Sequence, residues 1–175
     1  MSEHAHIDPS NKKIALLIAI LALCLAITET LSKAYQTEVI TKQVEASNLW
    51  AFFQAKSMRK TSTELAIDSL KATSSASDPK KEELISKWSA AVKRYDTEPE
   101  TGEGRKELAA RAKKAEQLGN IANHKYHNFE IASGMLQVAI VLASASIITA
   151  VGLLGLLSGG LGFVAVGFSI FAIFF

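Results

Sequence analysis

The longest apolar stretch of the chain is "IASGMLQVAIVLASASIITAVGLLGLLSGGLGFVAVGFSIFAIFF", residues 131–175. Its 45 residues include no Asp, Glu, Lys, Arg or His. Since about 20 apolar residues cross a bilayer, the stretch predicts two transmembrane helices joined by a turn. A turn at 152–155 divides the stretch more evenly than one at 158–160, which leaves only about 15 residues, or roughly 22 Å of helix. Gln137 is the one amide in the first of these two helices, and we expect it to hydrogen-bond to a neighbouring helix.

A second apolar stretch, "IALLIAILALCLAITETL" at residues 14–31, follows the polar tail of residues 1–13. As a helix it is about 27 Å long, close to the thickness of the hydrocarbon core. Leu23 precedes Cys24 where cleavage of a signal peptide needs a small side chain, so we expect a retained anchor. Cys24 is the only cysteine, which excludes a disulfide within the chain.

Glu29 is the only ionisable residue within these predicted spans. A carboxylate inside a membrane is a candidate functional group by default. Alternatively, Glu29 lies at the headgroup level and pairs with Lys33 four residues later on the same helix. We favour the pair with Lys33.

The central residues, 32–130, are predicted to form a helical domain outside the membrane. Residues 10–72 contain no Gly and no Pro, so the first helix should continue through 32–72. Asp78-Pro79 is a typical helix start and begins a helix over 79–95. The acidic turn at 96–104 then precedes a helix over 104–130 that enters the membrane. The sequence therefore predicts an all-α integral membrane protein with three transmembrane helices and a helical hairpin or three-helix bundle.

An aromatic segment, "NLWAFFQAKSMRK", occupies residues 48–60 of this domain. Leu49, Trp50 and Phe53 fall on one helix face. Because aromatic stripes at helical spacing are most often core, we expect this face to pack against another helix. The large residues available as packing partners are Trp88, Tyr95 and Leu118.

Phe52 points about 100° away from Phe53 and so lies off this face. Contact with a neighbouring chain would explain an aromatic residue at that position. Lipid contact would require the helix to bend back to the bilayer. Nucleic acid is disfavoured because residues 32–130 carry 17 Lys and Arg against 14 Asp and Glu, whereas nucleic-acid domains usually have a clearly basic face.

Four histidines are weak candidates for metal binding: His4, His6, His124 and His127. The first two lie in the tail, and the other two lie at i and i+3 just before the membrane without a cysteine or acidic pair to complete a site. We expect no metal and no other cofactor. No phosphate-binding loop, catalytic triad or zinc-protease motif is present in the sequence, so we expect no enzymatic activity.

Two segments, "ASNLWAFFQAK" at 46–56 and "EPETGEG" at 98–104, resemble those of an uncharacterised group of bacterial membrane proteins, domain of unknown function 4337. The histidine-containing tail, the Tyr126-His127-x-Phe129 sequence and the apolar C-terminus extend the resemblance over nearly the whole chain. The resemblance implies a small integral membrane protein and supplies no catalytic residue. Core packing alone does not account for the polar residues beside the aromatics, so we hypothesise a face that contacts a partner or another subunit, formed by Asn48, Leu49, Trp50, Phe52, Phe53, Gln54 and Lys56.

Orientation follows from the basic residues near the spans. Four basic residues precede the second span, namely Arg111, Lys113, Lys114 and Lys125. The turn after that span has no basic residue. We therefore expect a multi-pass protein of the bacterial inner membrane with its helical domain in the cytoplasm.

The function expected from these features is that of a membrane-anchored scaffold. Its partners would be the lipid bilayer and either further copies of itself or another membrane protein, and not nucleic acid. The alternative is a small oligomeric channel or a transporter accessory subunit. A channel should show polar residues repeated along one face of a span, and Gln137 with scattered Ser and Thr gives little of this.

Overall fold

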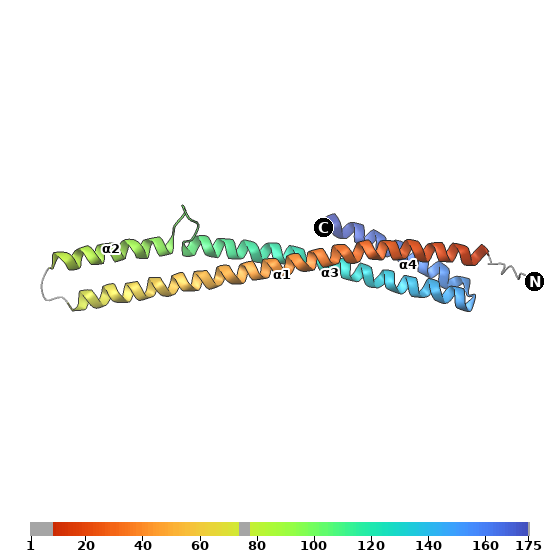
Figure 1. The fold of residues 1–175 in the computed structure, drawn as a ribbon, viewed down its shortest axis with the longest axis horizontal. Helices are drawn as coiled ribbons and strands as arrows, with labels where there is room; N and C mark the ends of the chain where they lie inside the picture. The colour runs from red at the N-terminus through yellow and green to blue at the C-terminus, as the bar shows by residue number, and fades with distance from the viewer. Residues whose placement is uncertain (1–8, 74–77, 175) are drawn as a thin grey trace, which may run out of the picture. The chain divides into compact units, whose positions relative to one another are not determined.

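A computed structural model describes residues 9–73 and 78–174 of the chain, and in this part it contains four helices and no strand. This confirms the all-α prediction. The helices follow one another in chain order (Figure 1): α1 (Pro9–Ala72), α2 (Pro79–Asp96), α3 (Arg105–Thr149) and α4 (Gly152–Phe174).

The helices form two compact units. Unit 1 combines Met1–Val39 with Asn120–Phe175, and unit 2 is Ile40–Gly119. The long helices α1 and α3 contribute residues to both units, whereas α4 belongs to unit 1 and α2 to unit 2. Each unit has its own buried cluster, described separately below.

Unit 1 packs α1, α3 and α4 together through leucines and small side chains. Its buried cluster contains Leu21, Leu136, Ala139 and Ala165. The hydroxyl of Ser158, which is fully buried, donates a 2.7 Å hydrogen bond to the carbonyl oxygen of Ala139. Small residues at helix contacts let the backbones approach closely, as in membrane helix pairs.

The outward surface of unit 1 is apolar. By length and composition, three helices could cross a membrane, and the most apolar windows of α1, α3 and α4 are only 11%, 33% and 28% buried. Large side chains such as Leu16, Ile148 and Phe163 are among the most exposed. Because exposing such side chains to water costs about 1.5–3 kcal/mol each, this surface matches a hydrocarbon environment.

The turn between α3 and α4 lies at Ala150 and Val151, just before the predicted 152–155. Ala150 adopts a left-handed conformation with φ of 55°, and the hydroxyl of Ser146 donates to the carbonyl oxygen of Val151 at 3.0 Å. The three residues 158–160, which offered a second turn, lie inside α4. Glycine permits a helix break here but does not force one when the surrounding residues pack well as a helix.

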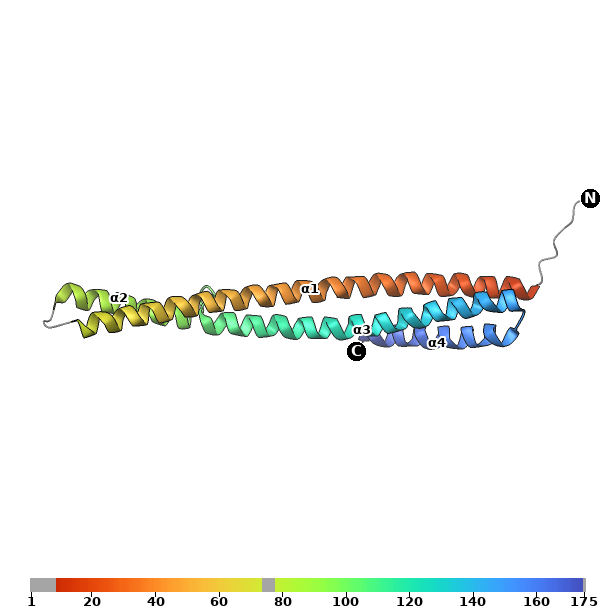
Figure 2. The same cartoon turned by 90° about the horizontal axis from the view of Figure 1, so that it is seen from below.

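Unit 2 is an antiparallel hairpin in which α1 forms one arm and α2 followed by α3 forms the other. In both views α2 lies beside the C-terminal part of α1 (Figures 1 and 2). Contacts with α1 move steadily along the chain, from Lys60 with Asp96 of α2 to Lys42 with Gly119 of α3. The alternative prediction of a three-helix bundle is therefore wrong, because α2 and α3 follow one another along α1 and do not pack side by side.

Local capping fixes the ends of α2. Asp78 precedes the helix and accepts a 3.0 Å hydrogen bond from the backbone N–H of Lys80, with Pro79 in the first turn. At the other end, the backbone N–H of Thr97 donates to the carbonyl oxygen of Lys93 at 3.1 Å. The loop that follows, residues 97–104, separates α2 from α3.

Glycine at position 162 should be necessary for the packing of α4 against α1. A Cβ atom added there would clash with the buried side chain of Leu21, whereas one added at Gly167 would meet nothing within 4 Å. We expect G162A to destabilise the protein by about 1–3 kcal/mol, the usual cost of overpacking. G167A, on the same helix, should be neutral or slightly stabilising, because alanine favours helix more than glycine does. Thermal unfolding of both variants in detergent measures the difference, and equal melting temperatures would contradict the packing described.

Candidate functional site

The aromatic segment of α1 faces the interior of unit 2. Trp50 and Phe53 pack against a cluster formed by Ala46 and Leu49 of α1 with Leu108, Ala112 and Ala115 of α3. The two rings meet edge to face, with 5.5 Å between their centroids. The indole N–H of Trp50 donates a 2.7 Å hydrogen bond to the carboxylate of Glu116. This face therefore packs against a helix of the same chain.

The partners of this face differ from the predicted ones. Leu118 is 38% exposed, and Trp88 and Tyr95 belong to a shallow groove with Ser62 and Thr63. On α3, the aromatic rings meet Leu108 together with Ala112 and Ala115, whose small side chains leave room for them. Helical periodicity identified the correct face of α1 but not the side chains opposite it.

Lys56 follows the aromatic residues on the same side of α1 and is 7% exposed. Its ammonium group lies 3.5 Å from the carboxylate of Glu98 and 3.8 Å from that of Glu103. The same nitrogen lies over the rings of Phe52 and Tyr95, at 5.6 and 5.8 Å from their centroids. A buried charge needs such partners, so Lys56 attaches both α2 and the following loop to α1.

The loop is held from its other side by Glu107 in the first turn of α3. One carboxylate oxygen accepts a 2.7 Å hydrogen bond from the Thr97 hydroxyl, and the other accepts from the backbone N–H of Glu98 at 3.2 Å. The guanidinium of Arg94 donates two hydrogen bonds to one oxygen of Glu98, at 2.7 and 3.1 Å. Glu98 thus links Arg94 of α2 to Lys56 of α1.

A second group of charges lies one turn further along α1. The carboxylate of Asp96 accepts hydrogen bonds from Lys60 at 3.1 Å and from Arg105 at 3.0 Å. Arg105 also donates to the hydroxyl of Ser57 at 2.8 Å and lies over the ring of Phe53, at 5.1 Å. We call these residues and the preceding loop contacts the charged junction: Lys56, Ser57, Lys60, Arg94, Asp96, Thr97, Glu98, Glu103, Arg105 and Glu107.

Two glycines of the loop allow the close approach. Gly102 has φ of +67°, a conformation that side chains disfavour. Gly104 is buried, and a Cβ atom there would lie 2.7 Å from the Cα of Thr97 and would also clash with Glu98 and Glu107. The glycines of the "EPETGEG" segment are therefore required by the backbone geometry of the junction.

Hydrogen bonds lower the pKa of three junction carboxyls. The pKa of Asp96 lies below its ordinary value because Lys60 donates a hydrogen bond to it. That of Glu98 is lowered by the hydrogen bonds from Arg94, and that of Glu107 by the hydrogen bond from Thr97 and by backbone N–H groups. Each of these groups favours the ionised form in the folded protein.

The remaining residues of the predicted contact face divide into two sets. Leu49, Trp50, Phe53 and Lys56 are engaged inside unit 2, as described above. Asn48, Phe52 and Gln54 are exposed, with Phe52 at 36%. Only the second set is available to another molecule.

In unit 1 the structure brings together the two polar residues predicted within spans. The side-chain amide of Gln137 donates a 3.1 Å hydrogen bond to the carboxylate of Glu29. The expected hydrogen bond of Gln137 to a neighbouring helix is therefore present, and its acceptor is Glu29. Glu29 therefore pairs with a residue of α3 in the structure. The favoured prediction, a pair with Lys33 on the same helix, is not the contact observed.

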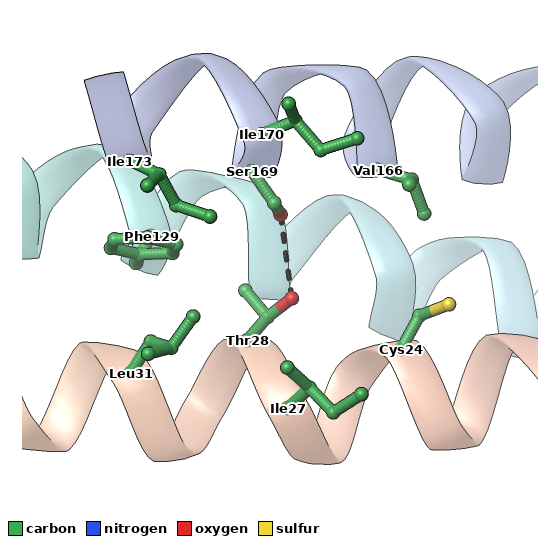
Figure 3. Close-up of a pocket in the computed structure, with 9 residues that line it drawn as sticks. All are labelled: Cys24, Ile27, Thr28, Leu31, Phe129, Val166, Ser169, Ile170 and Ile173. Carbon is green, nitrogen blue, oxygen red and sulfur yellow. Dashed lines mark hydrogen bonds between the residues drawn. The ribbon is translucent and has the colours of Figure 1, made fainter. Parts of the chain in front are cut away.

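A small apolar hollow of unit 1 lies between side chains of α1, α3 and α4 (Figure 3). It has a volume of about 170 Å³, and the hydroxyl groups of Thr28 and Ser169 lie 3.3 Å apart across it. Since each hydroxyl has the other as partner, the hollow offers an incoming molecule mainly hydrocarbon contacts. It is lined by Cys24, Ile27, Thr28, Leu31, Phe129, Val166, Ser169, Ile170 and Ile173.

The end of α4 is capped from α3. The ammonium of Lys125 donates to the carbonyl oxygen of Ile173 at 3.0 Å and lies 5.7 Å from the ring centroid of Tyr35. Tyr35 in turn stacks on Phe129, with 5.5 Å between the ring centroids. Cations favour the C-terminal ends of helices, so Lys125 stabilises an end of α4 that lacks its own basic residue.

The structure describes two of the four candidate histidines, His124 and His127. His127 lies 3.6 Å from the carboxylate of Glu130, and His124 is exposed. His4 and His6 lie outside the described residues. Within residues 9–73 and 78–174, no group of three or more His, Cys, Asp and Glu side chains is placed to hold a metal ion.

The family model for Domain of unknown function (DUF4337) matches residues 10–175, nearly the whole chain. The chain belongs to this family. No curated protein and no solved structure matches it significantly. The resemblance seen in the sequence is thereby confirmed, and its two segments, 46–56 and 98–104, are those that meet at Lys56 and Glu98 in this DUF4337 member.

Sequence reasoning missed most of the charged junction. Lys60 was read only as part of the aromatic segment, Asp96 as the start of the acidic turn, and Arg105 as a contribution to net charge. No local spacing connects the three residues, because they come from different parts of the chain. The available signal was the buried-face position of Lys56. A lysine at helical spacing from Leu49 and Phe53 needs an acidic partner, and "EPETGEG" is the most acidic loop in the sequence.

Removing the buried ammonium should weaken unit 2. In K56M, Glu98 and Glu103 lose a cation while the apolar stem of the side chain is kept. We expect the melting temperature to fall by about 5 °C, equivalent to roughly 1 kcal/mol in a domain of this size. K113M makes the same replacement at an exposed position of α3 in the same unit. This control should change the melting temperature by no more than about 2 °C. Circular dichroism of the full chain in detergent measures both, and an equal response would show that Lys56 does not attach the loop.

Acid should destabilise unit 2 through the junction carboxyls. Their pKa values are lower in the folded state than in the unfolded state, so they stabilise the fold above the ordinary carboxyl pKa of about 4. This contribution disappears as the pH falls from about 4 through the lowered values. D96N should melt below wild type at pH 7 and lose less stability between pH 7 and pH 3. Parallel pH curves for the two proteins would exclude Asp96 as a contributor.

Proposed function

We propose that this DUF4337 protein is a membrane-anchored helical scaffold that acts by assembly and catalyses no reaction. In this proposal α1, α3 and α4 anchor unit 1 in the bacterial inner membrane, and unit 2 extends into the cytoplasm. The scaffold binds further copies of itself or a protein partner. The observation that carries the proposal is the contrast between an apolar outer surface on unit 1 and a charged interior in unit 2 that is satisfied by its own side chains.

The anchor is supported by the exposed apolar surface of unit 1. Ile148 is 85% exposed and Phe163 is 82% exposed, and a water-soluble protein rarely exposes a contiguous apolar surface of this kind. Lys125 and Tyr35, with their ring–cation contact, are residue types that favour the membrane–water interface. The basic residues ahead of the second span favour a cytoplasmic unit 2.

The role in assembly is supported by the state of the ionisable groups. At the charged junction each carboxylate meets a cation, a hydroxyl or a backbone N–H of the same unit. Such pairing stabilises a fold, whereas a catalytic group has to reach a substrate from an open site. Neither the groove beside Trp88 nor the hollow beside Cys24 is lined by a nucleophile–base pair, and Cys24 is the one thiol, imidazole or carboxylate side chain among their lining residues.

A channel is the second candidate, and Glu29 is the residue that favours it. A carboxylate within an apolar segment is costly and is often functional. Glu29 is hydrogen-bonded to Gln137, however, and Thr28 to Ser169. These polar side chains face neighbouring helices and satisfy one another, as in helix association, and do not repeat along a path.

The mass of the purified particle tests the proposal. Extracted in detergent, the full chain should form an oligomer or a defined complex, with a protein mass that is a multiple of the 18.8 kDa chain or includes a stoichiometric partner. A strictly monomeric particle without a partner would overturn the assembly role, and a chain that stays in water without detergent would overturn the anchor. Reconstituted liposomes test the channel: the scaffold should pass no ions, and an ion flux that E29Q abolishes would favour the channel.

A further inference from the structure

The outer face of α1 in unit 2 carries a seven-residue repeat of exposed, mainly small or apolar side chains. Val44, Met58 and Leu65 are 54%, 72% and 62% exposed. The positions alternate in spacings of four and three residues, apart from the last step of seven: Val44, Asn48, Ala51, Ala55, Met58 and Leu65. These residues, which we call the outer stripe, lie on the side of the helix opposite the buried Leu49 and Phe53. The spacing is that of the a and d positions of a coiled coil.

We propose that the outer stripe is the seam of a parallel, in-register coiled coil between two copies of this chain. The inference rests on the proposed scaffold function and specifies its partner and its contact face. Val44, Ala51, Met58 and Leu65 occupy d positions, and Asn48 and Ala55 occupy a positions. Each side chain then meets its own counterpart in the second copy.

The membrane determines the direction of this pairing. Two copies anchored in one bilayer enter it with the same orientation, so their α1 helices run parallel when they meet in unit 2. In a parallel pair, Asn48 of one copy faces Asn48 of the other. The amide group has both donor and acceptor atoms and can therefore hydrogen-bond to its counterpart. A single asparagine at an a position selects a two-stranded, in-register arrangement at some cost in stability.

The charges beside the stripe permit the same arrangement. In a parallel coiled coil each g position meets the e position five residues later on the partner. Along the stripe these pairs are Ser47 with Phe52, Gln54 with Arg59, and Thr61 with Ala66. No pair brings two like charges together, and the Gln54 carbonyl can accept from the Arg59 guanidinium.

The size of the stripe favours a second copy over a soluble partner. Residues 44–65 span about 32 Å of helix, and with a helix about 10 Å wide the seam covers roughly 300 Å² per copy. Stable interfaces between free proteins need about 800 Å² on each partner. Alanines and an asparagine weaken this seam further. Anchoring two partners in one membrane raises the effective concentration of each for the other to the millimolar range. A second copy of this chain is anchored in the same membrane and so has this advantage.

Disulfide cross-linking in native membranes tests the contact. In a C24S background of the full chain, A51C should form a covalent dimer on mild oxidation, because d positions of the two helices face each other. Q43C and E64C replace exposed residues that directly precede a stripe residue and therefore point about 100° away from it. These two control variants should remain largely monomeric. Cross-linking of the controls without that of A51C would overturn the proposed face.

Charge substitution gives a second test that does not depend on cysteine chemistry. M58E combined with L65E places like charges in the seam at positions that are exposed within one copy. We expect loss of the dimer with helix content and melting temperature of unit 2 retained. Q43E combined with Q117E adds the same two charges at exposed positions of unit 2 that lie outside the seam, Gln117 being on α3, and should leave the dimer intact.

The outcomes separate this proposal from the scaffold function. If the wild type is oligomeric, but A51C does not cross-link and M58E/L65E remains oligomeric, the outer stripe is not the seam and the scaffold function stands. If the wild type is a monomer in membranes and in detergent, without a partner, both are overturned. If M58E/L65E unfolds, the cross-linking of A51C against Q43C and E64C decides alone.

Discussion

The buried ammonium of Lys56 holds the loop between α2 and α3 against α1. A cation that is removed from water has to be compensated by nearby carboxylates or by aromatic faces, and Lys56 meets Glu98, Glu103, Phe52 and Tyr95. These partners come from α1, α2 and the loop, so the loop has to return to α1 at that level. Because Glu107 then holds the loop from the start of α3, α3 continues along α1 in the direction of α2, and the hairpin forms without a third layer.

The helix α1 belongs to both units, and the side chains that it buries and exposes differ between them. In unit 2, α1 buries charges and aromatics against α2 and α3, and its polar side chains are satisfied locally. In unit 1, the same helix buries Leu21 and Thr28 but exposes other large apolar side chains, such as Leu16 and Leu23. Among the polar residues of its apolar segment 14–31, Thr28 and Glu29 are hydrogen-bonded to other helices, and the hydroxyl of Thr30 donates to the carbonyl oxygen of Ala26. An apolar exterior with mutually satisfied interior polar groups is the expected solution in hydrocarbon, where unpaired polar groups are expensive.

The sequence predicted those features that depend on local chemistry or on helical periodicity. The all-α class, the family, the start at Asp78-Pro79 and the inward face of Leu49, Trp50 and Phe53 can all be read from nearby residues. Partners across helices could not be read in this way. Lys33 is the local candidate for Glu29, yet Gln137, 108 residues away in the chain, is the recorded partner. Likewise, Trp88, Tyr95 and Leu118 were expected opposite the Leu49–Trp50–Phe53 face, but Leu108, Ala112 and Ala115 lie there. Periodicity identifies a face, whereas tertiary register decides what that face meets.

The inward-facing side chains of α1 already have partners within the hairpin, and this limits how unit 2 can bind another molecule. The polar residues of the "ASNLWAFFQAK" segment that core packing did not explain now separate by direction: Lys56 points inward to the charged junction, whereas Asn48 and Gln54 point outward. An inward-facing residue cannot bind a partner without opening the hairpin, which would leave Glu98 without Lys56. The outward residues can do so at no cost to the fold. In the proposed scaffold, α1 would therefore hold its own hairpin with one face and assemble with the opposite face, and the exposed Asn48 would belong to the second face.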